Sequence, residues 1–198
     1  KRGDLTLPEG FTGFVNFTST TGDLNCASCG QLTFKSRVGK LRGVGDKLPE
    51  VNCDARIETN GSITLGGIGG TAMIYTKTGK VTIGRENTSY ANRFEISTKS
   101  GDVIMYGHYS NSESKVSTKY GDIQIQSLEF MVLTTNYGDI ELDKVARGKF
   151  ITKSGDVSIT EVVNQVEIET KSGDIELGSE ETTIQTANIT TKSGDVEI

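Results

Sequence analysis

The sequence predicts an all-β fold of the parallel β-solenoid class, in which about eleven short coils stack into one rod. Three observations predict this fold: a turn motif that recurs along the chain, aliphatic residues at fixed distances from each turn, and a composition rich in glycine. The 198-residue chain contains 24 glycines and 2 prolines. Its apolar residues are mostly Val, Ile and Leu placed singly between polar ones, which is typical of half-buried strands.

The repeated element is a predicted turn around a glycine, and its most regular sequence is Thr-Lys-Ser-Gly-Asp. This pentapeptide occurs at residues 98–102, 152–156, 170–174 and 191–195. A unit of 17 to 22 residues cannot bury a core alone, so neighbouring units are expected to stack and share one. Aligned on the turn glycine, the copies are centred on Gly3, Gly22, Gly39, Gly61, Gly79, Gly101, Gly121, Gly138, Gly155, Gly173 and Gly194.

Apolar columns accompany each turn and predict the strands. The second residue after the glycine is aliphatic in every copy, and the fourth is apolar in every copy except at Gly43. A third apolar column lies five residues before the glycine. In the fourth copy Ile57 stands only four residues before Gly61, so it belongs to this column if that copy has lost one residue of its turn. Seven residues after the glycine, a further set predicts a third wall; it comprises Cys29, Ile68, Leu128, Val145 and Val162.

Ser or Thr usually stands three residues before the turn glycine, on the same face as the apolar columns. A hydroxyl there can bond to backbone groups where the chain bends. We therefore interpret this column as an inward-facing corner of the solenoid.

An antiparallel meander of β-hairpins is the alternative fold, because it satisfies the same alternation. With Ser-Gly as a two-residue turn, the two apolar columns would face each other across neighbouring strands. The third apolar position and a remainder of variable length favour the solenoid, because they are expected to form a third wall and a connecting loop in each coil.

Residues 1–198 are predicted to be a single domain, less regular over 1–78 and regular over 79–198. Its uncapped ends predict a fragment of a longer chain or of an assembly.

Serial turns of the form S-G-D-[VI] between short alternating strands resemble a bacterial family of predicted adhesin domains. The resemblance is clearest from Phe94 to Ile198 and weakens before Gly79, where the turns read TTGDL, RVGKL, TNGSI and KTGKV. It implies a parallel β-solenoid in an extracellular or cell-envelope protein, and it brings no catalytic residues with it. Nothing in the sequence excludes a cytoplasmic location.

The charges of the chain argue against nucleic acid as a partner. The net charge is -5, and the basic residues occur singly rather than in clusters. Asp usually follows the turn glycine, and Lys or Arg usually stands two residues before it, so we expect the two files to neutralise each other. Each exposed pair is worth only about 0–1 kcal/mol. Calcium between the Asp residues is the alternative, although calcium-binding solenoids have shorter, more glycine-rich repeats.

The three cysteines lie on apolar columns, and we expect them to be small buried side chains. A disulfide between Cys29 and Cys53, from nearby coils, is the alternative. Cys26 and Cys29 have the C-x-x-C spacing, but a zinc site needs about four ligands. We therefore predict no metal site and no cofactor.

The predicted function is that of a non-catalytic structural or adhesive module, a rigid scaffold for binding or for end-to-end assembly with further copies. No apolar stretch is long enough to cross a bilayer. No nucleophile has an accompanying base in the sequence pattern, so we predict no enzymatic activity and no catalytic residue. Two alternatives remain: a self-polymerising, cytoskeletal-type solenoid, and a carbohydrate-binding or carbohydrate-active solenoid.

Recognition is expected where the repeat fails, at residues 44–52, 85–93 and 106–114. Aromatic and polar side chains on such segments can hold a protein or a cell-surface glycan beside a rigid scaffold. The predicted contact residues are Tyr90, Arg93, Tyr106, His108 and Tyr109.

Overall fold

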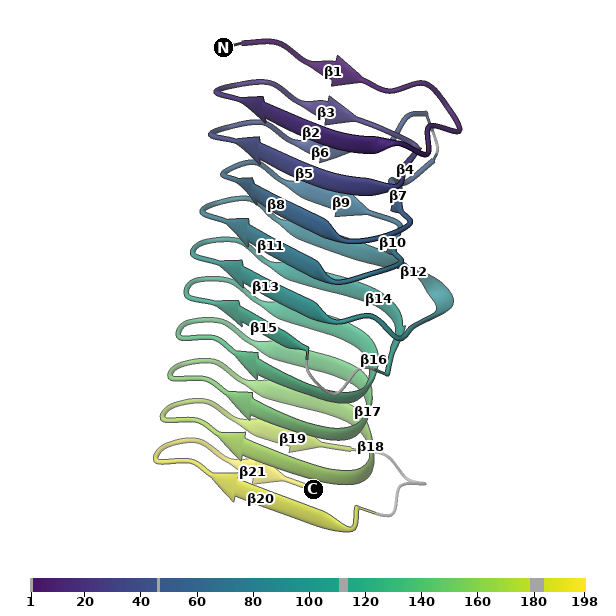
Figure 1. Ribbon diagram of the computed structural model, residues 1–198. Helices are drawn as coiled ribbons and strands as arrows, with labels where there is room; N and C mark the ends of the chain where they lie inside the picture. The colour runs from purple at the N-terminus through teal and green to yellow at the C-terminus, as the bar shows by residue number, and fades with distance from the viewer. Residues whose placement is uncertain (1, 46, 111–113, 179–183) are drawn as a thin grey trace.

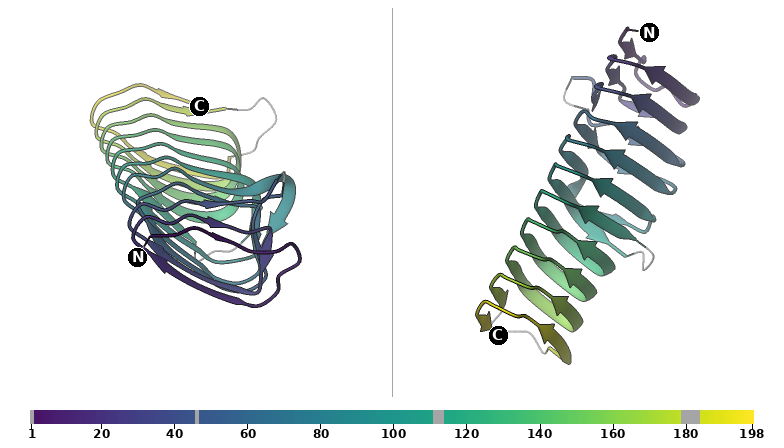
Figure 2. Two further views of the ribbon diagram at one scale, coloured as in Figure 1. Left: turned by 90° about the horizontal axis from the view of Figure 1, so that it is seen from above. Right: turned by 90° about the vertical axis from the view of Figure 1, so that its left-hand side faces the viewer.

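The structure, a computed structural model, describes residues 2–45, 47–110, 114–178 and 184–198. These residues form a rod of stacked β-coils that runs from the N-terminus at one end to the C-terminus at the other (Figure 1). Viewed along the rod, successive coils follow nearly the same outline (Figure 2). The described residues form no helix, and therefore none that could span a membrane.

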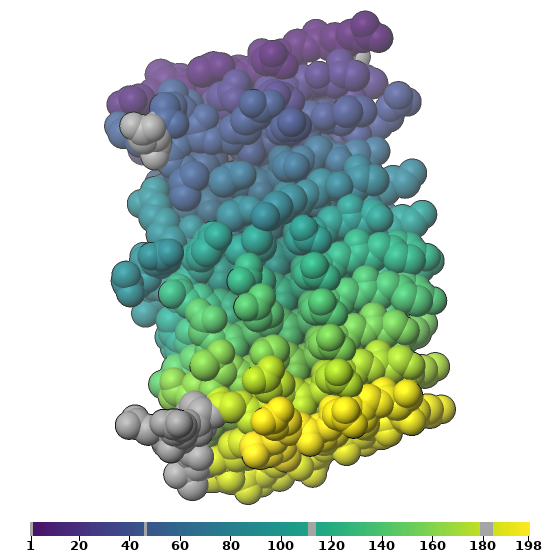
Figure 3. Space-filling model, turned by 180° about the vertical axis from the view of Figure 1, so that it is seen from behind, coloured from purple at the N-terminus to yellow at the C-terminus, as the bar shows by residue number. Residues whose placement is uncertain are grey.

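Each coil contributes to three walls. The entry wall leads into the turn glycine and contains β2 (Phe14–Ser19), β5 (Gln31–Ser36), β8 (Ala55–Thr59), β11 (Ala72–Thr76), β13 (Phe94–Thr98), β15 (Lys115–Thr118) and β20 (Thr186–Thr190). The exit wall follows the turn and contains β1 (Leu5–Thr6), β3 (Leu24–Asn25), β6 (Leu41–Arg42), β9 (Ile63–Leu65), β19 (Ile175–Leu177), β21 (Val196–Glu197) and the first parts of β12 (Val81–Tyr90) and β14 (Val103–Tyr109). On the exit wall, rows of side chains follow the coils (Figure 3).

The side wall joins the exit wall to the next entry wall. It begins as the short strands β4 (Ser28–Cys29), β7 (Glu50–Val51) and β10 (Gly67–Ile68), which form a separate sheet. In later coils one long strand runs from the exit wall through the side wall to the entry wall; these strands are β16 (Ile123–Thr134), β17 (Ile140–Ile151) and β18 (Val157–Glu169).

Strand direction decides between the two predicted folds. All pairings between the named strands are parallel, and the described residues contain one antiparallel bridge, Val44 with Lys47. The solenoid is therefore confirmed and the hairpin meander is wrong. The register also places Ile57 between Phe34 and Ile74, which confirms that the fourth copy has lost one turn residue.

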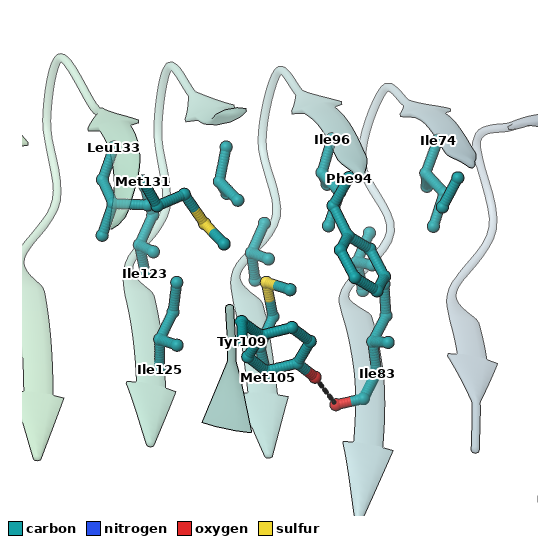
Figure 4. Packing of buried hydrophobic residues seen from close by; sticks show 14 of the residues in the cluster. Ile74, Ile83, Phe94, Ile96, Met105, Tyr109, Ile123, Ile125, Met131 and Leu133 are labelled. Atoms are coloured by element: carbon teal, nitrogen blue, oxygen red, sulfur yellow. Dashed lines mark hydrogen bonds between the residues drawn. The ribbon is translucent and has the colours of Figure 1, made fainter. Parts of the chain in front are cut away.

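The predicted apolar columns form one continuous core. Ile83 and Ile123 of the exit wall are fully buried, and Ile74, Ile96 and Leu133 of the entry wall point into the same interior (Figure 4). The members of the third apolar column are also buried, which confirms the side wall. Burial of this kind is the main source of stability, at about 25 cal/mol per Å² of apolar surface.

The hydroxyl column lines the inner side of the corner, as predicted. Thr76 is fully buried; its Oγ1 donates to the carbonyl of Gly61 at 3.3 Å and accepts the N–H of Gly79 at 3.1 Å. Each such hydroxyl ties its coil to the preceding turn and satisfies a buried backbone group. The same bond to the turn glycine one coil earlier is made by Ser36, Thr59, Thr118, Thr135 and Thr152.

The Asp file is not held by ion pairs with the Lys file, so that expectation is wrong. The Oδ1 of Asp122 accepts the backbone N–H of Asp139 at 2.9 Å, and the Oδ1 of Asp139 accepts that of Asp156 at 2.8 Å. A short carboxylate reaches the N–H on the next coil, which would otherwise lack a partner. No lysine of the predicted file forms an ion pair within the described part of the chain.

The cysteines are three free thiols, so the Cys29–Cys53 disulfide is not formed. Cys29 is buried opposite Val51, whereas Cys53 lies two residues beyond Val51 and is exposed. Cys53 stands beyond the end of β7, and the expectation of burial fails for it. Cys26 is buried, and its hydrogen bond with Cys29, together with burial, raises the pKa of its thiol.

Candidate functional site

Strand β12 contains the clearest departure from the repeat. Gly84 pairs with Tyr106 and Ser89 pairs with His108, so four residues of β12 stand opposite a single residue of β14. The excess forms a bulge that projects from the rod (Figure 2). Asn87 at its tip has a φ of 58°, which Asn tolerates better than most residues. The bulge lies within the predicted segment 85–93.

Tyr90 and Tyr109 anchor this bulge from inside the core. They are 7% and 1% exposed, and their rings stack with centroids 5.1 Å apart. The Tyr90 hydroxyl accepts the N–H of Arg85 at 3.0 Å and donates to the carbonyl of Gly66 at 2.8 Å. These contacts satisfy backbone groups that the bulge removes from the ladder. The prediction that Tyr90 and Tyr109 contact a ligand is therefore wrong.

Burial explains why the two rings point inward. Tyr109 occupies the side-wall position that Leu128 holds in the next coil. Its one hydroxyl proton is shared between the carbonyls of Tyr106, at 2.8 Å, and Ile83, at 3.3 Å (Figure 4). A buried phenol that is fully bonded stays protonated, and burial raises the pKa of Tyr109. The ring also packs edge-on against Phe94.

Two adjoining hollows beside the bulge form a polar groove, the side-wall groove. The larger, of about 440 Å³, lies over the side wall, and the smaller, of about 120 Å³, lies over the exit wall. Both are lined by Gln126 and Asp143. The larger also contains Asn87, Ser89, His108, Ser127 and Lys144, and the smaller contains Glu86, Tyr106 and Gln124.

The predicted residues divide between the groove and the rest of the surface. The structure brings Tyr106 and His108 to adjoining parts of the groove. Tyr106 is 38% exposed, so part of its ring is available to a ligand. Arg93 is exposed at the start of the next entry wall and does not line the groove.

Hydrogen bonds between coils fix the polar side chains of the groove. The Nδ1 of His108 lies 2.8 Å from the Oγ of Ser127, and its Nε2 lies 3.6 Å from the Oε1 of Glu129. Gln126 accepts the N–H of Gly107 at 2.7 Å, which leaves its amide NH₂ as a donor. The groove thus offers an imidazole, an amide and a hydroxyl in defined positions, beside the carboxylate of Asp143.

Sequence reasoning missed Gln126, Ser127 and Asp143. They occupy ordinary outward positions of regular coils, and nothing in their local sequence distinguishes them. Ser127 meets His108 because the two are 19 residues apart, which is one coil. A search for polar side chains separated by one repeat length would have found this pair.

The comparisons with known proteins bear on the whole chain. The model of the Toastrack DUF4097 family matches residues 2–198. No curated protein and no solved structure matches the chain. The family match agrees with the β-solenoid described above.

Proposed function

Because the chain belongs to the Toastrack DUF4097 family, we propose that it is a non-catalytic, rigid scaffold of the cell envelope or extracellular space. Its task is to present the side-wall groove to a ligand, and that ligand is a neutral glycan on a cell surface. The observation that carries the proposal is the groove itself, a set of fixed polar side chains beside a partly exposed aromatic ring.

The rigidity of the rod supports the scaffold role. Hydroxyl and carboxylate side chains bond most coils to their neighbours along one corner, and a continuous core fills the interior. A ligand that binds to such a surface loses little energy to reorganisation of the protein. A site on regular strands is also held more accurately than one on loops.

The chemistry of the groove favours a sugar. Amide, carboxylate and imidazole groups bond well to neighbouring hydroxyls, and an aromatic ring can cover the apolar face of a pyranose. Glu86 and Asp143 line the groove, and its lysine, Lys144, is already paired with Glu161, so an acidic ligand would be repelled. A neutral, hydroxyl-rich ligand fits these charges best.

Solvent exposure supports binding rather than catalysis. The side chains of His108 and Glu129 are 40% and 54% exposed. Polar groups accelerate reactions most when water is excluded from them. The Ser127–His108–Glu129 set is therefore better suited to hold hydroxyl groups than to activate a nucleophile.

A glycan-binding assay with matched variants tests the proposal. Neutral glycans are screened with the immobilised protein, and the best binder is titrated against Tyr106→Ala and Gln126→Ala. We expect each variant to weaken binding about tenfold. Tyr137→Ala is the control, because Tyr137 is also exposed, at 52%, but belongs to a turn. Unchanged binding by Tyr106→Ala contradicts the groove assignment, and glycan cleavage that Ser127→Ala abolishes contradicts the non-catalytic role.

A further inference from the structure

The turn corner around Gly39, Gly61 and Gly79 differs in charge from the rest of the rod. At these three consecutive turns the residue after the glycine is not Asp; it is Lys40, Ser62 or Lys80. The file two residues before the glycine nevertheless keeps Arg37 and Lys77. The result is a cluster of cations, the basic corner, made of Arg37, Lys40, Lys77 and Lys80.

Among the described residues, no ion pair neutralises the basic corner. All four side chains belong to exposed residues, and none of them forms an ion pair with another residue that the structure describes. The Asp file borders the cluster on both sides. Asp23 is bound to Arg42 at 2.7 Å, and the Oδ1 of Asp102 accepts the N–H of Asp122.

The net charge also differs between the two parts of the chain, and it is more positive in the N-terminal part. Residues 1–78 contain nine basic and seven acidic side chains, whereas residues 79–198 contain twelve and nineteen. An anion approaching the rod is therefore attracted to the first region and repelled by the second. This distribution directs an anionic ligand to the coils that contain the basic corner.

Two hollows on the outer face of the entry wall adjoin the corner. Their volumes are about 350 and about 330 Å³, and Glu58 and Tyr75 line both. Arg37 lines the first and Arg56 lines the second. The first lies over β2, β5 and β8 and reaches Tyr75 on β11, and the second lies over β8, β11 and β13; Figure 1 shows these strands on the front of the rod.

Tyr75 stands where the two hollows meet, and it is 50% exposed. A ring in this position offers an apolar platform between two guanidinium groups, Arg37 in the first hollow and Arg56 in the second, where the carboxylate of Glu95 also lines the wall. Glu58 is held by Lys35 at 2.8 Å, whereas Arg37 and Arg56 form no ion pair with a described residue and keep their guanidinium donors available.

We infer that this surface is a second binding site, which takes an acidic oligosaccharide whose sugar units bear carboxylates. A sugar ring lies on Tyr75, and carboxylates on the flanking units pair with Arg37 and Arg56. Arg binds carboxylate with two parallel hydrogen bonds, which gives it selectivity for this group. The lysines of the basic corner add attraction that screening by salt weakens.

The charges favour an oligosaccharide over a nucleic acid. Nucleic acid is a long polyanion, and it would have to pass the acidic region beyond the corner. A short acidic sugar chain needs only the cations around Tyr75. The exposed ring of Tyr75 also favours a sugar over an inorganic anion, because an inorganic anion has no apolar face to pack on the ring.

Isothermal titration with a hexa-uronate tests the inference, and a neutral hexasaccharide is the matched ligand. We expect binding of the uronate alone, weakened several-fold when salt rises from about 50 to about 200 mM, as about two pairing contacts imply. Tyr75→Ala and Arg56→Gln should each raise the Kd about tenfold. All substituted positions are exposed, and thermal unfolding verifies that the variants fold.

Matched controls show whether the uronate binds at Tyr75 and its flanking arginines. Tyr137→Ala removes an equally exposed tyrosine, and Lys171→Gln removes a turn lysine that has Asp174 on the same turn; both should leave the Kd unchanged. Tyr106→Ala should also leave uronate binding intact, which separates this site from the side-wall groove. Equal binding of the neutral sugar, insensitivity to Tyr75→Ala, or displacement by single-stranded DNA or a poly-glutamate peptide at equal concentration overturns the inference.

Discussion

The N-terminal region, residues 1–78, and the C-terminal region, residues 79–198, build the same coil in different ways. In the first, the exit and side walls are separate two- or three-residue strands, and β4, β7 and β10 form their own sheet. In the second, β16, β17 and β18 run for 12, 12 and 13 residues through all three walls. In the coil that follows Gly39, the residues Gly43, Gly45 and Pro49 disfavour such continuity, because glycine and proline weaken the interior of a strand.

The difference shows how a repeat can vary without loss of the fold. The hydroxyl corner and the apolar columns are present in both regions, whereas the carboxylate ladder is interrupted between Asp23 and Asp102. The core holds the coils together, so the outer positions of the turns are free to change. Both candidate sites lie where the regular pattern is interrupted.

The largest expected effect tests whether the two regions unfold separately. Phe34→Ala and Phe150→Ala remove fully buried rings from the first and second region, and each should destabilise by about 3–5 kcal/mol. Because coils contact only their neighbours, Phe34→Ala should speed hydrogen exchange mainly in residues 14–76, and Phe150→Ala mainly in residues 123–169. Uniform acceleration along the whole rod by either variant would contradict independent regions.

A smaller effect concerns the close stacking of turns. A methyl group at Gly138 would overlap the carbonyl oxygen of Gly121 on the preceding coil. We expect Gly138→Ala to destabilise by about 1–3 kcal/mol, measured by urea unfolding. At Gly178 an added methyl group meets no atom within 4 Å, so Gly178→Ala is the control and should be close to neutral. Equal effects at both positions would show that turn stacking is not tight.

A smaller effect on stability is expected from the corner hydroxyls, where a bonded threonine can be compared with an unbonded one. The Oγ1 of Thr135 donates to Gly121, whereas the buried Oγ1 of Thr98 has no hydrogen-bond partner among the described residues. Thr135→Val should cost about 1 kcal/mol, and Thr98→Val should be neutral or stabilising. Chemical denaturation of both variants measures the difference. A greater loss from Thr98→Val than from Thr135→Val would refute the assignment of the bonded hydroxyls as links between coils.

The smallest effects are those of exposed ion pairs, one in each region. A hydrogen bond from Lys47 lowers the pKa of Glu9, so this pair stabilises above the unfolded pKa of Glu9 and is lost as the pH falls through the folded pKa. Hydrogen bonds to Glu167 and Glu169 raise the pKa of Lys149, so that contribution is present below the unfolded pKa of Lys149 and is lost as the pH rises through the folded one.

Titration by NMR checks both directions. The Glu9 carboxyl signal should titrate at lower pH in the parent protein than in Lys47→Gln. The Lys149 side chain should titrate at higher pH in the parent protein than in the double variant Glu167→Gln/Glu169→Gln. Because all of these groups lie at the surface and are at least partly exposed, the midpoint of thermal unfolding should hardly move.

The regular features could be predicted because each obeys the repeat. The columns assign Ile57 to its place despite a shortened turn, and its register with Phe34 and Ile74 confirms the assignment. The bulge residues could not be placed in the same way. Tyr90 and Tyr109 lie in segments without a period, so no neighbouring copy indicates whether their rings point into the core or into the solvent. The prediction for Cys53 was wrong for the same reason.

The sequence by itself determined the period, the inward-facing columns and the hydroxyl corner, because stacked copies must present like residues to one core. Tertiary structure decided everything that depends on contacts between coils. It decided that Asp binds a backbone N–H rather than Lys, that Ser127 meets His108, and that Tyr75 lies between two arginines. These contacts join residues about one or two repeats apart, and whether they form depends on side-chain reach and direction.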